Sequence, residues 1–411
     1  MRMLKEAHPR WLLLGCLAHA LSLLIKDLGD QKQGKCGYVQ KVYSAAASMS
    51  NLIGDADKVR ASLHRHQQQR NGKASAIAVN CPTRFATMHF VTKDLYDNRD
   101  AIKDVVMDDD DDSDAQWSAI SKDLTHAATF ENVAKGVVTG RGRPITFNDF
   151  NACIDLVNPI SDAIHQFERD DPLLSQVLPA WRTLFKHADV WDAANGDKTG
   201  GIKVKSIFQS RFDKHYDYSW SAAFLLDPVH ATKSEGGVWY LAWDDLSEEK
   251  IGHAIQCIKQ LAGGAADAAV AAAVEEEFAL LRLDPLSDSM AASLPLLTKR
   301  EQQESGKVLL AKASSRRAWW DRSGRKAFPL IAEAAMRLLS FHVTSCSAER
   351  NWSTWGNVCK KARNRLALSR SEMLVTVQCS DREAKSAEAG EEIVLRVMAE
   401  EEANELVSDS E

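Results

Sequence analysis

Residues 345–366 read S-C-S-A-E-R-N-W-S-T-W-G-N-V-C-K-K-A-R-N-R-L. Ser347 is a suitable helix cap, and Glu349 in the first turn suits the positive end of the helix dipole. The stretch ends in a basic string whose side chains can contact phosphates; its members are Lys360, Lys361, Arg363 and Arg365. A solvated basic face accounts for the same residues equally well, so composition alone leaves both interpretations open.

The residues on either side of this stretch also have helical patterns. Upstream, after Trp319 and Trp320, residues 328–342 repeat apolar side chains about every four positions, which predicts a helix with a wide apolar face. Downstream, residues 369–378 begin with Ser369 and place Glu372 three positions later, the spacing of a capping box. The C-terminal part of the chain is therefore expected to be helical.

Charge is distributed unevenly along the chain. The net charge is -6, but residues 299–382 contain seventeen Lys and Arg and seven Asp and Glu, a net charge of +10. Residues 383–411 contain ten acids and two bases, a net charge of -8, and are expected to be disordered. A basic module of this kind can attract a polyanion.

The N-terminal part predicts helices and one short strand. Residues 11–16 form an apolar run that predicts a buried strand, and residues 17–28 place four leucines on one helix face. A longer helix is predicted over residues 38–69. Residues 284–306, which contain two prolines and several serines, resemble a linker. The fold class expected from the sequence is mainly α.

Several classes of protein lack support in the sequence. Eight scattered cysteines form no C-x-x-C pair, which argues against a disulfide scaffold. Cys16 and His19 have the spacing of half a zinc site, but no second half accompanies them, so no metal site is predicted. No phosphate-binding glycine loop or nucleophile elbow is present, and we expect neither a cofactor nor a small-molecule substrate. The apolar run of residues 11–25 is shorter than the roughly 20 residues that span a bilayer.

In its C-terminal segment and in three upstream blocks the chain resembles the hAT transposases and their domesticated relatives. Residues 319–377 resemble the hAT C-terminal dimerisation region: paired Trp, an apolar helix, S-x-x-E-R-x-W/F-S, and K-K-x-R-N-R-L before a closing helix. Upstream, residues 8–27 resemble the C-x-x-H segment of the family, P-T-R-F-A at 82–86 resembles its T-R-W-S block with Phe85 in place of Trp, and residues 220–228 resemble its L-D-P block.

The resemblance implies a ribonuclease-H-like α/β core interrupted by a large helical insertion. It predicts a remnant of that core at residues 1–75, the insertion at 76–298, the dimerisation region at 299–382 and an acidic tail at 383–411. In the family two Asp and one Glu hold divalent metal such as Mg²⁺, and Glu349 matches the third acid. The two Asp belong to strands before the C-x-x-H segment, so the chain is expected to be N-terminally truncated and catalytically incompetent.

The resemblance also implies a homodimer and nucleic-acid binding. The residues expected to contact nucleic acid are Arg84, Arg350, Lys360, Lys361, Arg363 and Arg365. The residues favoured as anchors of the dimer interface are Trp319, Trp320, Leu330, Leu338, Leu339, Trp352, Trp355 and Leu374. Each anchor fits an intramolecular core equally well, because periodicity does not distinguish a core from an interface.

Three functions are therefore in competition. The first is a transposase-derived protein that dimerises in the nucleus, or otherwise in the cytoplasm, and binds DNA without cleaving it. The second is the C-terminal part of an active cut-and-paste DNA transposase, in which Glu349 is catalytic. The third is a protein-interaction scaffold that does not bind nucleic acid.

Overall fold

The computed structural model describes residues 8, 11–30, 36–78, 87–107, 135–139, 145–169, 171–264, 267–298, 301–302, 308–309, 311–345, 352, 355–356, 373 and 376. The chain divides into two compact units, Met1–Thr344 and Ser345–Glu411. Nearly all described residues belong to the first unit. The predicted divisions at 75/76, 298/299 and 382/383 stay predictions.

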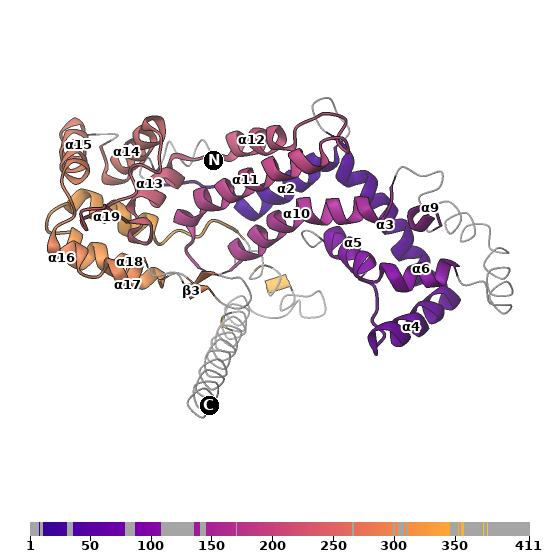
Figure 1. Ribbon diagram of the computed structural model, residues 1–411. Helices are drawn as coiled ribbons and strands as arrows, with labels where there is room; N and C mark the ends of the chain where they lie inside the picture. The colour runs from indigo at the N-terminus through magenta and orange to yellow at the C-terminus, as the bar shows by residue number, and fades with distance from the viewer. Residues whose placement is uncertain are drawn as a thin grey trace. The chain divides into compact units, whose positions relative to one another are not determined.

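The first half of the first unit is built from helices (Figure 1). They are α2 (Leu17–Gly29), α3 (Tyr38–Asp55), α4 (Asp57–Asn71), α5 (Thr87–Asp97), α6 (Arg99–Met107), α9 (Lys135–Thr139), α10 (Phe147–Phe167), the 3₁₀ turn η2 (Leu174–Gln176), α11 (Val177–Asn195) and α12 (Val204–His215). Helix α10 packs against α2, α3, α5 and α11 and so forms the centre of this half. Its N-terminus has a capping box between Thr146 and Asp149, whereas the one predicted at Ser369 and Glu372 lies outside the described residues.

The second half gathers around one short helix, α13. Its elements are α13 (Tyr218–Leu226), η3 (Pro228–His230), β1 (Thr232–Lys233), β2 (Trp239–Tyr240), α14 (Glu248–Ala262), α15 (Ala268–Leu283), α16 (Asp288–Ala291), α17 (Leu294–Leu297), β3 (Glu301–Gln302), β4 (Val308–Leu309), α18 (Ala313–Trp319), the π-helical turn η4 (Trp320–Gly324) and α19 (Pro329–Leu338). All residues of α13 except Tyr218 are buried, because α11, α14, α19 and η2 surround it.

The structure confirms the prediction of a mainly helical fold and several predicted helix faces. Leu17, Leu21, Leu24 and Leu28 are all buried along α2. The predicted apolar face of residues 328–342 forms α19, where Ile331, Ala334, Ala335 and Leu338 are buried. The periodicity of apolar residues was sufficient to find both helices.

Three local predictions were wrong. Residues 11–16 form no strand but lead into α2, and Trp11 is 52% exposed. The strands that the structure describes have two residues each and form two antiparallel pairs, β1–β2 and β3–β4. A strand needs a neighbour to pair with, and an apolar run alone does not supply one. The helix predicted over residues 38–69 is divided at Ala56 into α3 and α4. The predicted linker contains α16 and α17, and Leu286, Met290, Leu294 and Leu297 are buried there.

No helix in the described ranges is long and apolar enough to cross a bilayer.

Gly324 lies at a point of close packing in the second half. A Cβ added to Gly324 would overlap the Trp320 indole, far inside the distance of van der Waals contact. Trp320 is fully buried and so has little room to move. We therefore predict that Gly324→Ala lowers the free energy of unfolding by about 1–3 kcal/mol, as measured by urea denaturation.

Gly252→Ala is the matched control for this substitution. Gly252 lies inside α14, and a Cβ added there meets no atom within 4 Å. This control should raise the free energy of unfolding by about 0.5–1 kcal/mol, because Ala favours a helix interior over Gly. Equal effects of the two substitutions would contradict the packing argument.

Candidate functional site

The L-D-P block of residues 226–228 forms a turn whose Asp is completely buried. Helix α13 ends at Leu226, and Asp227 caps the next short turn, where its Oδ1 accepts a hydrogen bond from the backbone N–H of Val229 at 3.1 Å. Pro228 occupies the first position of that turn, where a missing N–H costs nothing. The turn therefore fixes the Asp227 carboxylate in the interior.

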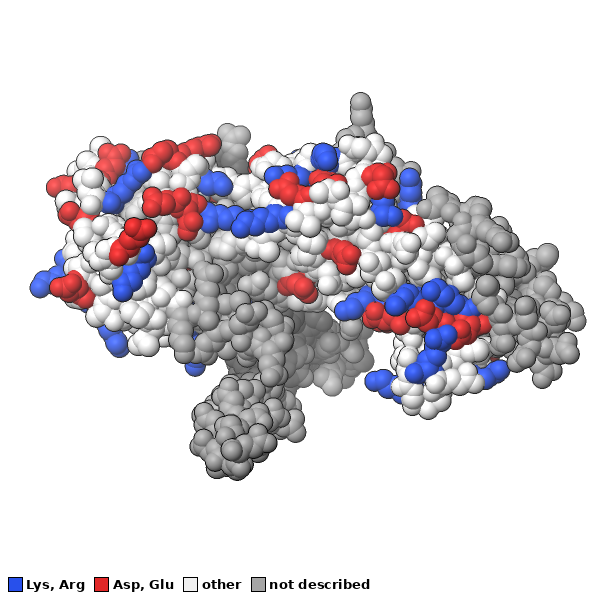
Figure 2. All heavy atoms as spheres, in the orientation of Figure 1, with Lys and Arg blue, Asp and Glu red and all other residues white. Residues whose placement is uncertain are grey.

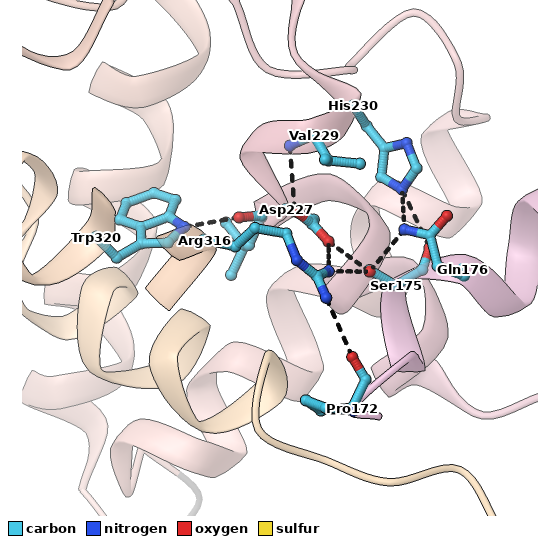
Figure 3. Close-up of polar contacts among 9 residues, drawn as sticks. Pro172, Ser175, Gln176, Asp227, Val229, His230, Arg316 and Trp320 are labelled. Atoms are coloured by element: carbon cyan, nitrogen blue, oxygen red, sulfur yellow. Dashed lines mark hydrogen bonds and ion pairs between the residues drawn. The ribbon is translucent and has the colours of Figure 1, made fainter. Parts of the chain in front are cut away.

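Arg316 of α18 is the charge partner of Asp227 (Figure 3). Its Nη1 forms an ion pair with Asp227 Oδ2, and the Ser175 hydroxyl donates a hydrogen bond to the same oxygen. Arg316 also donates from Nη1 to Ser175 Oγ at 3.3 Å and from Nη2 to the carbonyl oxygen of Pro172 at 3.3 Å. Both side chains of the pair are buried, at 3% and 0% exposure. Three distant segments of the chain thus meet at one carboxylate.

Polar groups of η2 and η3 extend this network. Gln176 Nε2 donates to Ser175 Oγ at 3.1 Å and lies 3.2 Å from Nε2 of His230. The His230 ring stacks on Phe224, with 4.4 Å between the ring centroids. The network therefore joins η2, which precedes α11, to η3, which follows α13.

Two tryptophans hold the following segment against the same turn. The Trp320 indole donates to the carbonyl oxygen of Leu226 at 2.6 Å, and the Trp319 indole donates to that of Met290 at 2.8 Å. The two rings meet edge to face, with centroids 4.9 Å apart. Arg316, Trp319 and Trp320 together attach α18 and η4 to the L-D-P turn.

The Asp227–Arg316 pair has a structural role. Asp227 has no contact with solvent and its charge is balanced by Arg316, so it is not available to bind a ligand or transfer a proton. Across the described ranges no group of three or more His, Cys, Asp or Glu side chains is placed to hold a metal ion. We call the group of Ser175, Asp227 and Arg316 the junction.

The predicted interface residues fall into two groups. Trp319, Trp320, Leu338 and Leu339 are buried in the core of the first unit, and Leu330 is half-buried there. In the second unit Trp352 and Trp355 are helical; Trp352 is 72% exposed and Trp355 is half-buried. In a single chain the first group belongs to the core, and its role in a dimer remains a prediction.

The other predicted site residues lie outside the described part of the chain. They are Glu349, the residues expected to contact nucleic acid (Arg84, Arg350, Lys360, Lys361, Arg363 and Arg365) and the interface residue Leu374. Their roles remain predictions.

The sequence analysis did not identify the junction. The L-D-P block pointed to Asp227 only through its resemblance, and nothing in the sequence paired it with Arg316, 89 positions away. The sequence carries no local signal for this pair, because Arg316 and Arg317 are adjacent before the two tryptophans and the structure buries only Arg316. The second buried ion pair, between Asp27 of α2 and Arg211 of α12, was missed for the same reason.

We predict that Arg316→Met lowers the free energy of unfolding by about 3–5 kcal/mol, because it leaves the Asp227 carboxylate buried without a charge partner. Urea denaturation measures this loss. The double variant Asp227→Asn/Arg316→Met should recover part of it, since no buried charge remains.

Arg325→Met provides the matched control. Arg325 forms an ion pair with Asp321 at 3.0 Å, but both side chains are more than half exposed. Loss of an exposed pair should cost at most about 1 kcal/mol. If Arg325→Met and Arg316→Met destabilised the protein equally, burial would not be the cause.

Comparison with known proteins identifies one segment. Residues 307–379 match the model of the hAT family C-terminal dimerisation region. No curated protein matches the chain. The matched segment begins before Arg316 and includes Trp319, Trp320, α19 and the two helical tryptophans of the second unit. The chain is thus similar to the dimerisation region of the hAT family over these residues.

Proposed function

We propose that this chain is an hAT-transposase-derived protein that forms a homodimer through residues 307–379 and binds nucleic acid. The observation that carries the proposal is the match of residues 307–379 to the hAT dimerisation region. The ordered blocks upstream of that segment, from Cys16-x-x-His19 to the L-D-P turn, support the same origin. We also propose that residues 1–75 derive from a ribonuclease-H-like core.

Exposed apolar side chains in the matched segment support self-association. Trp352 and Met373 are helical positions of the second unit, and their exposed fractions are 72% and 68%. Large apolar side chains that are exposed in one chain are available for contact with a second copy, and both residues lie in the matched segment. Tryptophan is also the residue type that most often dominates the energy of an interface.

Charge supports nucleic-acid binding. The segment of residues 299–382 has a net charge of +10, and its basic string at 360–365 contains four Lys and Arg within six positions. Neutralising phosphates releases the ions condensed on a nucleic acid, and this release drives binding. A role with nucleic acid agrees with a location in the nucleus.

Glu349 matches one of the three acidic positions that the resemblance requires. One carboxylate does not organise two metal ions around a phosphate. With the residues of this sequence alone, we propose for Glu349 the role of a helix-start carboxylate that interacts with the helix dipole.

For dimerisation we predict that Trp352→Ala weakens self-association about tenfold or more, because truncation of a buried interface tryptophan commonly costs over 1.4 kcal/mol. Sedimentation equilibrium of the full chain measures the dissociation constant. Leu283→Ala is the matched control: Leu283 is 77% exposed and lies outside the matched segment, so its truncation should leave the constant unchanged. A wild-type chain that stays monomeric at micromolar concentration would refute the homodimer.

For nucleic-acid binding we predict that the logarithm of the association constant falls steeply with the logarithm of salt concentration. Replacing Lys360, Lys361, Arg363 and Arg365 by Ala should reduce that slope by about 3.6, since each phosphate contact contributes close to 0.9 on duplex DNA. Fluorescence anisotropy with labelled duplex measures the slope. A salt slope that the four substitutions leave unchanged would favour the scaffold function. In a separate assay, strand transfer activity that Glu349→Gln abolishes would favour the active transposase.

A further inference from the structure

A groove opens on the first unit beside α18, η4 and α19. It has a volume of about 1060 Å³. Arg317, Asp321 and Arg325 of the α18–η4 segment line it together with Met336 and Arg337 of α19. Trp11, which precedes α2, lines it as well. The groove therefore combines charged and apolar side chains from segments that are more than 300 positions apart in the sequence.

Positive charge exceeds negative charge by one along this groove. Arg317, Arg325 and Arg337 line it, together with the carboxylates of Asp321 and Glu333. Both carboxylates are bonded to an Arg four positions later, in the pairs Asp321–Arg325 and Glu333–Arg337. Arg317 has no carboxylate partner within the described ranges and donates a hydrogen bond to Ser340 Oγ at 3.0 Å.

This excess is local. In the view of Figure 2, Lys and Arg alternate with Asp and Glu over the described surface and form no extended area of one sign. A polyanion is therefore not expected to bind that face through general attraction. A site that selects a polyanion must add contacts of another kind to its charge.

Trp11 supplies such a contact. Its side chain is 52% exposed, and its ring lies parallel to the His8 ring, with centroids 4.0 Å apart and an angle of 12° between the planes. Gln260 Nε2 of α14 donates to the carbonyl oxygen of Trp11 at 3.3 Å and so holds the residue against α14. An accessible flat aromatic ring in the same groove as surface arginines is the combination that binds single-stranded nucleic acids, because bases stack on the ring while cations contact the phosphates.

We propose that this groove binds single-stranded nucleic acid, with Arg317 and Arg325 contacting phosphates and Trp11 stacking on a base. A duplex offers the phosphates but keeps its bases stacked inside, so it would use the cations without the ring. The inference rests on the proposed nucleic-acid function and adds to it contact residues other than the basic string at 360–365.

The test measures binding of the full chain to labelled oligo(dT) of roughly 16 nucleotides by fluorescence anisotropy. Trp11→Leu should weaken binding about tenfold and Trp11→Phe clearly less, since Phe keeps a flat ring.

Arg317→Ala/Arg325→Ala should reduce the salt slope by about 1.4, the value for two phosphates on a single strand. The matched control is Lys93→Ala/Lys186→Ala, which removes two exposed cations of α5 and α11 and should leave the slope unchanged.

An oligonucleotide of equal length without bases separates stacking from charge. It should bind the wild-type chain about tenfold more weakly than oligo(dT), and this difference should vanish in Trp11→Leu. If the groove variants bind oligo(dT) as tightly as the wild type, the groove is not the site, and the proposed function still stands on the basic string. If polyglutamate binds as tightly as oligo(dT) and Trp11→Leu has no effect, the groove is a site for an acidic protein. A wild-type chain that binds no nucleic acid refutes both proposals.

Discussion

The buried ion pair of Asp227 and Arg316 is the constraint on which the second half of the first unit depends. A carboxylate and a guanidinium that are buried away from water are stable there only while they form an ion pair with each other. Asp227 is fixed by its turn after α13, so Arg316 has one favourable position. That position fixes the start of α18, and Trp319 and Trp320 then fill the space beside it.

The junction connects two sequence blocks that resemble different parts of one family. The L-D-P turn belongs to the helical portion upstream, whereas Arg316 and both tryptophans lie inside the segment that matches the dimerisation region. That segment therefore does not begin as an independent domain: its first part, through α19, completes the core around α13. A contact made on the exposed surface of α18, η4 or α19 is consequently made on a rigid support.

The local parts of this architecture could be predicted from the sequence, and the tertiary parts could not. The leucines of α2 and the apolar face of α19 repeat with the period of a helix, and burial of one face follows from that period. Helix α13 has no such period because it is surrounded on all sides, so only its composition indicated burial. The run at residues 11–16 looked like a strand since apolar content alone does not reveal whether a pairing partner exists.

Charge illustrates the same limit for the candidate sites. Arg316, Arg317 and Arg325 belong to one basic segment in the sequence, yet they have three different environments: a buried ion pair, a hydroxyl contact to Ser340, and an exposed pair with Asp321. The net charge of the segment is the same whichever residue is buried, so composition predicts attraction for polyanions but not the side chains that provide it. Of the three, Arg316 is committed to the fold, and Arg317 and Arg325 remain at the surface. Ligand binding at this segment must therefore depend on Arg317 and Arg325, whereas the stability of the fold depends on Arg316. Substitutions of these residues can for that reason separate stability from binding.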